Sequence, residues 1–192
     1  MGQVDVLQGE EVNLIYPVGT SYPVSQTYAE HVARAKQNGW CTKPGHCPGG
    51  VYYYPGWHWA CPTGTPVRAA DSGRCEVQNQ GSAGYGLNVR ITHKDGYYTI
   101  YAHLQKAMVV TGIDALQGDL IGYTDNTGNS TGPHIHFELR KNGVPTDPMQ
   151  FLTTDEPAPE PPDVFNPAHI PEYSLARVTK AIGRSEERRV GK

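Results

Sequence analysis

The segment Gly-Pro-His-Ile-His-Phe-Glu-Leu, residues 132–139, decides the fold class of this 192-residue chain. Successive side chains of a β-strand point to opposite faces, which puts His134, His136 and Glu138 on one face and the apolar residues 135, 137 and 139 on the other. Two histidines two residues apart on a strand can both point toward the same centre, but their side chains do not reach it equally well. Either one binds a metal while the other faces a substrate, or both lie on a solvated surface.

Short runs rich in β-branched and aromatic residues continue this pattern on both sides of the segment. They are separated by Gly, Asp or Asn and comprise residues 65–70, 73–78, 86–93, 97–103, 119–123 and 135–140. Lys94-Asp95-Gly96 is typical of a hairpin turn. The sequence therefore predicts a mainly β protein with an antiparallel sheet and one or two short peripheral helices.

One helix is predicted over residues 26–38, because Tyr28, Val32 and Ala35 form an apolar stripe. Either Ser25 or Thr27 is its expected N-cap. His31 follows Tyr28 by three residues and so lies on the inward side, as expected of a buried core histidine.

Composition excludes several classes of protein. The formal charge of −3 is too small for a dedicated nucleic-acid binder. No run approaches the roughly 18 to 20 apolar residues of a membrane span, and the first 14 residues lack the features of a signal peptide. We therefore expect no nucleic-acid partner and no membrane insertion.

The chain is expected to contain one folded domain with extensions. An N-terminal arm (1–24) precedes the domain (25–152). Six of the 16 prolines lie within residues 157–171, which predicts an extended linker over 153–173. The remaining tail, 174–192, is too short to fold alone, and its last nine residues (184–192) resemble a translated sequencing adapter. A wall-binding domain missing at the C-terminus is compatible with this organisation.

The four cysteines lack the C-x-x-C spacing of a zinc ribbon. Cys41 and Cys47 bracket a tight loop that a disulfide could close outside a reducing compartment. Cys61 and Cys75 lie in strand-like segments, which favours buried thiols.

The other histidines are less informative alone. His103 ends a predicted strand, where a surface histidine is more common than a catalytic one. His58 lies between Trp57 and Trp59, and these flanks predict partial burial with a hydrogen bond or a metal as its partner. His46, His93 and His169 are given no role.

Four motifs in order along the chain resemble a phage-lysin-like variant of the lysostaphin-type zinc metallopeptidases. They are GWHWACPTGTPVRAADSG (56–73), YAHL (101–104), GDLIGYT (118–124) and TGNSTGPHIHFEL (127–139). The resemblance spans about residues 25–152. It implies an antiparallel β domain with a long substrate groove, hydrolysis of peptide cross-bridges or stem peptides of bacterial peptidoglycan, and a location outside the cell, in the target wall or on a phage.

The resemblance also implies roles for individual residues. His136 corresponds to a zinc ligand, and His103 and His134 correspond to the two active-site histidines that are not ligands. The family's other ligands form a His-x-x-x-Asp pattern, but here Tyr54 replaces the histidine and His58 replaces the aspartate.

A variant style within the family supplies the missing ligand from an upstream Gln-x-Tyr/Phe-x-x-His segment, which here ends at His31. Three histidines and a water molecule still make a competent tetrahedral zinc site. We therefore expect metal-assisted amide hydrolysis, in which one of His103 and His134 transfers protons and the other holds the oxyanion. The alternative is a catalytically degenerate wall-binding or structural module.

Three further side chains are expected near the groove, and one behind the metal. Tyr54, Asn129 and Thr131 lie in the segments that would form the groove walls. Glu138 either orients a ligand ring or is a surface carboxylate.

Overall fold

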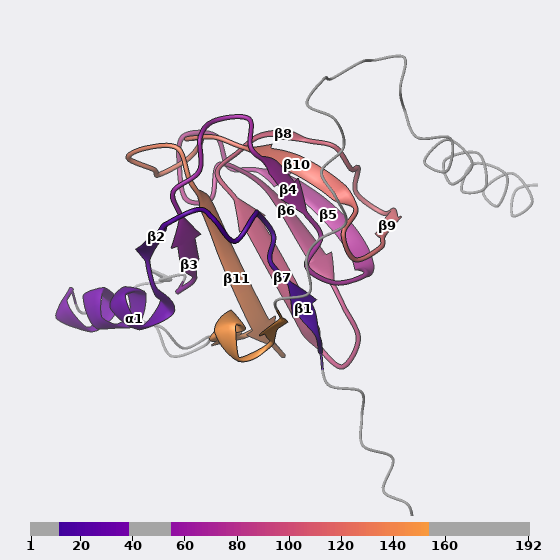
Figure 1. Ribbon diagram of the computed structural model, residues 1–192, viewed down its shortest axis with the longest axis horizontal. Helices are drawn as coiled ribbons and strands as arrows, with labels where there is room; N and C mark the ends of the chain where they lie inside the picture. Colours follow the sequence, from indigo (N-terminus) through magenta and orange to yellow (C-terminus); the bar gives the residue numbers. More distant parts are fainter. Residues whose placement is uncertain (1–11, 39–54, 154–192) are drawn as a thin grey trace, which may run out of the picture. The chain divides into compact units, whose positions relative to one another are not determined.

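The computed structural model describes residues 12–38 and 55–153 (Figure 1). Its large sheet has the order β2 (Val24–Gln26), β3 (Trp57–Trp59), β11 (Ile135–Lys141), β7 (Tyr97–Ala102), β6 (Leu87–Thr92), β5 (Gly73–Asn79), β9 (Asp114–Ala115), with β12 (Val144–Thr146) paired to β11. A smaller sheet has the order β4 (Pro66–Arg68), β10 (Leu120–Thr124), β8 (Leu104–Ala107). Every pairing in these two sheets is antiparallel, which confirms the predicted fold class.

Each predicted run overlaps a strand, three of which extend one residue beyond the run, and the hairpin between β6 and β7 turns at Asp95 and Gly96. Both residues have positive φ, at 54° and 75°, the conformation that such a turn demands.

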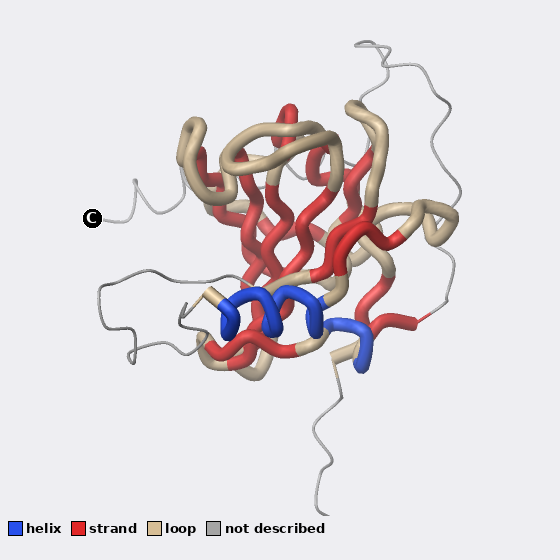
Figure 2. Tube along the Cα trace, turned by 90° about the vertical axis from the view of Figure 1, so that its left-hand side faces the viewer, coloured by secondary structure: helices blue, strands red, loops and turns tan. Residues whose placement is uncertain are grey.

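The helix α1 (Tyr28–Gln37) lies beside the edge of the large sheet formed by β2 and β3 (Figures 1 and 2). Thr27, one of the two candidates, is its N-cap. The Thr27 hydroxyl accepts a hydrogen bond from the Glu30 N–H at 3.2 Å, and the Glu30 carboxylate accepts one from the Thr27 N–H at 2.7 Å. This reciprocal capping box starts the helix at Tyr28. A 3-10 turn, η1 (Pro148–Gln150), follows β12.

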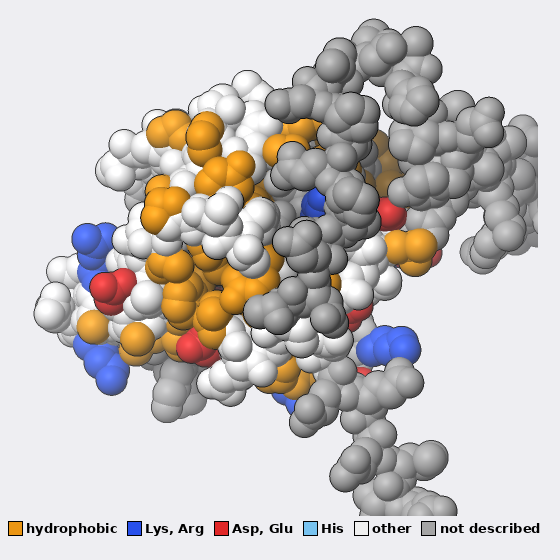
Figure 3. All heavy atoms as spheres, viewed as in Figure 1, with side chains coloured by type: hydrophobic (Ala, Val, Ile, Leu, Met, Phe, Trp, Pro, Cys, Tyr) orange, Lys and Arg blue, Asp and Glu red, His pale blue; other side chains and the backbone are white. Residues whose placement is uncertain are grey.

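The main core lies on one face of β11, where Ile135, Phe137 and Leu139 are fully buried with side chains from both sheets. Part of the predicted N-terminal arm contributes to it. Leu14 and Val18 are buried in this core, and β1 (Leu14–Ile15) pairs in parallel with β13 (Leu152–Thr153). The segment before β2 crosses the face shown in Figures 1 and 3, where hydrophobic side chains remain visible at the surface.

Cys61 and Cys75 are buried free thiols, as the sequence predicts. Cys41, Cys47 and most of the predicted linker and tail lie outside the described residues. Within the described part of the chain, no helix is long and apolar enough to cross a membrane.

Candidate metal centre

Two neighbouring strands bring two histidines together. In the antiparallel pair of β3 and β11, His58 lies directly opposite His136. The Nε2 atom of His58 is 2.5 Å from the Nδ1 atom of His136. Gly56 permits this close approach, because a Cβ atom there would lie 2.6 Å from the Phe137 carbonyl oxygen and 2.9 Å from the His136 ring.

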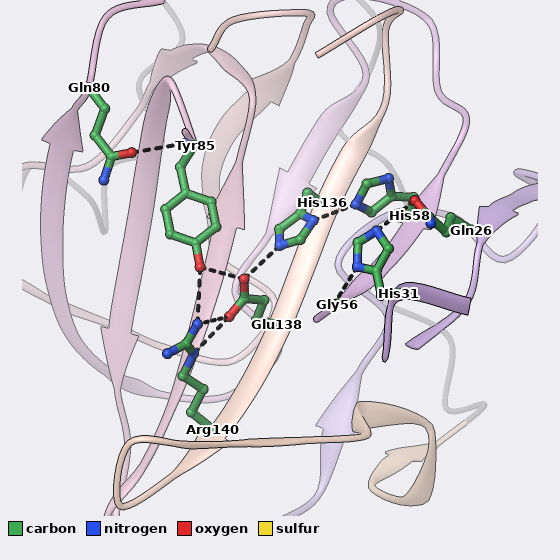
Figure 4. A network of polar contacts seen from close by, with 9 residues as sticks. All are labelled: Gln26, His31, Gly56, His58, Gln80, Tyr85, His136, Glu138 and Arg140. Carbon is green, nitrogen blue, oxygen red and sulfur yellow. Dashed lines mark hydrogen bonds and ion pairs between the residues drawn. The ribbon is translucent and has the colours of Figure 1, made fainter. Parts of the chain in front are cut away.

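Helix α1 contributes a third histidine, as Figure 4 shows. His31 is buried on the inner side of α1, where its Nδ1 accepts a hydrogen bond from the Gly56 N–H at 2.9 Å. Its Nε2 lies 2.6 Å from the Gln26 side-chain oxygen. One nitrogen each from His31, His58 and His136 lies within 4.8 Å of the other two. A ligand atom from His31 becomes available to a metal once one of its two hydrogen bonds is given up.

A buried polar network contacts His136 on the side of the ring that points away from His58 (Figure 4). The His136 Nε2 atom lies 2.7 Å from Glu138 Oε1, and Glu138 has no exposed surface. The Tyr85 hydroxyl donates to the same oxygen, and the Arg140 Nε donates to the other oxygen at 2.7 Å. Because the carboxylate accepts the Nε2 proton, the lone pair of His136 is at Nδ1, toward His58.

The two histidines of the predicted catalytic pair lie beside this cluster. His103 Nδ1 is 2.7 Å from the Thr127 carbonyl oxygen, and His134 Nδ1 is 2.8 Å from the Gly132 carbonyl oxygen. A carbonyl oxygen only accepts, so both rings carry their proton at Nδ1 and a lone pair at Nε2. The Nε2 atom of His134 is buried without a hydrogen-bond partner.

Ring positions connect the pair to the cluster. The His134 ring centroid lies 4.5 Å from that of His58 and 4.7 Å from that of His103, whereas His58 and His103 are 6.5 Å apart. The structure thus brings together in one site all five histidines to which the sequence analysis gave a role.

The backbone of His103 is left-handed, with φ of 62°, where the chain passes from β7 in the large sheet to β8 in the small one. A non-glycine residue in this region costs about 1–3 kcal/mol, so its surroundings must hold it there. The His103 N–H donates to the Tyr85 carbonyl, and its own carbonyl accepts from the Asp125 N–H. These bonds hold the residue in this conformation from both sides.

Burial keeps the five imidazoles neutral near pH 7. It is the main cause that lowers the pKa of His31 and of His103 to about 4, and it lowers the pKa values of His58, His134 and His136 as well. Repulsion from neighbouring histidines adds to the effect at each of these except His134. Neutral imidazole is the form that binds transition metals, so the donor set fits a zinc ion.

A groove of about 640 Å³ adjoins His58 and His134. It is bordered by α1 and by residues 131–134. Thr131 lines it, whereas Asn129 is exposed and is not among its lining residues. Tyr54, the third residue expected to bind substrate, lies outside the described residues.

Sequence reasoning missed several residues that shape the site. Gln26 begins the Gln-x-Tyr/Phe-x-x-His segment that ends at His31, and Arg140 continues the strand face of His136 and Glu138, so the sequence carried a signal for both. Gly56 allows its own segment to lie close to β11, and Tyr85 reaches Glu138 from a loop. No spacing of residues in the sequence indicates either contact.

Comparison with known proteins identifies a matching family and several similar proteins. Residues 52–148 match the model of peptidase family M23. The chain is 40% identical over 107 residues to the DD-carboxypeptidase/endopeptidase Mpg of Neisseria meningitidis, covering 56% of this chain and 24% of that protein. It is 39% identical over 102 residues to the peptidoglycan DD-endopeptidase ShyC of Vibrio cholerae, covering 52% and 23%. The chain thus spans about a quarter of the length of these curated relatives.

Among solved structures, a zinc-containing peptidase from Vibrio cholerae superposes with a TM-score of 0.55 at 29% identity, covering 71% of this chain and 39% of that one.

Proposed function

Because this chain belongs to peptidase family M23, the lysostaphin-type metallopeptidases, we propose that it is a zinc-dependent endopeptidase acting on bacterial peptidoglycan. The substrate bond would lie in a peptide cross-bridge or a stem peptide of the wall, outside the producing cell. The peptidoglycan DD-endopeptidase activity of the relative ShyC supports this substrate class.

One observation carries the proposal: three neutral histidines surround a common point beside two more whose Nε2 lone pairs are uncommitted. His31, His58 and His136 would hold the zinc. When bound, zinc polarises the scissile carbonyl and lowers the pKa of the attacking water. The other two histidines then perform the proton transfers.

We assign proton acceptance to His134, because its Nε2 is buried and unpartnered and its ring is nearer to His58 than the ring of His103 is. Its Nδ1–H bond to the Gly132 carbonyl keeps the lone pair at Nε2 and stabilises the ring once it is protonated. The protonated ring returns its proton to the leaving amine.

His103 would hold the oxyanion. A neutral His103 presents a lone pair, so it must first take up a proton from solvent at Nε2 to donate a hydrogen bond. Negative charge developing beside it raises its pKa and favours that protonated form.

The test combines metal analysis with the release of new amines from purified peptidoglycan. One zinc per chain together with amine release supports the enzyme. Zinc without amine release, or neither, contradicts it.

A second candidate is a degenerate wall-binding or structural module, favoured by the imidazole of His58 where the family has a carboxylate. Binding to peptidoglycan without amine release, in the zinc-loaded protein, supports this candidate over the enzyme.

A further inference from the structure

The groove beside the histidine cluster is lined on one side by a face of α1. Its helical lining residues, Glu30, Ala33, Arg34 and Gln37, are spaced i, i+3, i+4 and i+7, which places them on one helix face. This face is mainly polar, and the buried residues of α1, His31 and Ala35, are not among the residues that line the groove. The groove continues to His58 and His134, so a peptide bound at the cluster would extend along α1.

Among the described residues that line the groove, Arg34 is the one with a guanidinium group. Glu30 stands four residues before it, a spacing that ordinarily forms an ion pair. Here the Glu30 carboxylate is engaged by the capping box, where it accepts from the Thr27 N–H at 2.7 Å and the Thr27 hydroxyl at 2.9 Å. Within residues 12–38 and 55–153, no acidic side chain lies within 4.0 Å of Arg34. Its donors are therefore available to a ligand.

A planar guanidinium matches a carboxylate, which it binds through two parallel hydrogen bonds. Arg34 follows His31 by three residues, one helical turn from the cluster. A group bound there would belong to a substrate residue close to the scissile bond.

We propose that Arg34 is a specificity determinant that binds a free carboxylate of the substrate peptide close to the scissile bond. The inference rests on the proposed function for the position of the peptide, and it adds the chemical class that the groove selects. Substrates with that carboxylate converted to a carboxamide are poorer ligands and poorer substrates.

The experiment uses zinc-loaded full chain with native peptidoglycan and with peptidoglycan whose carboxylates have been amidated by carbodiimide and ammonia. Amine release and co-sedimentation are measured for the unaltered protein, Arg34→Gln and Lys36→Gln. Lys36 is an exposed cation on α1 outside the groove, so its variant controls for charge and helix stability. We expect about a tenfold preference for native peptidoglycan in both readouts, the scale of a charge-assisted hydrogen bond.

The preference disappears in Arg34→Gln and persists in Lys36→Gln. Equal handling of both peptidoglycans by the unaltered protein, or an unchanged preference in Arg34→Gln, overturns the inference. If no amine is released from either substrate, the proposed function fails, and co-sedimentation alone still decides the role of Arg34.

Discussion

Glu138 Oε1 lies 2.7 Å from the Nε2 atom of His136, inside the protein and with no exposed surface of its own. The contact sets the tautomer of His136 and leaves Nδ1 facing His58 at 2.5 Å. Arg140 and Tyr85 hold the carboxylate in turn. A buried carboxylate thus fixes the direction in which this histidine offers its lone pair.

Replacing Glu138 with Gln is expected to weaken zinc binding about 10- to 100-fold, the usual scale for residues that orient metal ligands. The amide is a weaker acceptor for His136 and leaves the Arg140 charge uncompensated. Competition with a chromophoric chelator measures the affinity. Tyr85→Phe, which removes one hydrogen bond to Glu138 without touching His136, should lose less than tenfold. Equal affinity in Glu138→Gln and the unaltered protein would contradict the orienting role.

Removing any proposed ligand is expected to lower the zinc content, because two protein ligands leave a weak site. His58→Ala and His136→Ala should lose most of the metal, and His31→Ala should lose it as well, because His31 gives up one of its two hydrogen bonds to bind the ion. His93→Gln is the matched control, since His93 is a buried histidine bonded to Ser72 and Thr99, outside the cluster. Full zinc in His136→Ala, measured by elemental analysis, would exclude the proposed ligand set.

Much of the fold was predictable because alternation of apolar residues is a local signal. The face of β11 that carries Phe137 is buried in the core, and Thr27 caps the helix as one of two candidates. By contrast, the parallel pairing of β1 with β13 joins residues far apart in sequence, so no local pattern predicts it.

The predictable part of the site ends at the histidines. Alternation places Glu138 and Arg140 on a polar face, and a polar face ordinarily meets solvent. Here the face is covered, with Tyr85 reaching Glu138 from a distant loop, so burial of the ion pair depends on tertiary packing. The uncommitted charge of Arg34 likewise follows from how Thr27 engages Glu30.

His103→Ala and His134→Ala are each expected to lower amine release about 10²-fold or more while retaining zinc. Each variant removes a proton-transfer or oxyanion group and leaves the proposed ligands in place. The double variant should be little worse than the poorer single variant if both residues serve one step. Rates on peptidoglycan, with zinc content as the control, test this expectation. Strictly additive losses would indicate independent roles.

Metal-free protein is expected to lose stability as the pH falls below about 6.5. The pKa of His103 is about 4 in the folded chain and about 6.5 when unfolded, so the unfolded state binds more protons between these values. Each such group lowers the free energy of unfolding by about 1 kcal/mol at pH 5.5 relative to pH 7.5. Urea unfolding of chelator-treated protein at both pH values measures the difference. Burial also lowers the pKa of His93, so this residue contributes in the same direction. His93→Gln should therefore reduce the difference in stability between the two pH values. Equal free energies of unfolding at both pH values would contradict the lowered pKa of His103 in the folded chain.

His58→Asp is expected to retain zinc and to raise hydrolysis of peptidoglycan. Position 58 lies directly opposite His136, so a carboxylate there remains within reach of an ion bound to His136. The carboxylate restores one negative charge to the site, which strengthens metal binding. The shorter side chain also clears space beside His134, whose ring centroid is 4.5 Å from that of His58. Zinc affinity and amine release are compared side by side with the unaltered protein, and His58→Asn, which has the same shape without the charge, separates charge from size. A fall in both quantities for His58→Asp would mean that the surrounding residues have adapted to imidazole, as a settled three-histidine site.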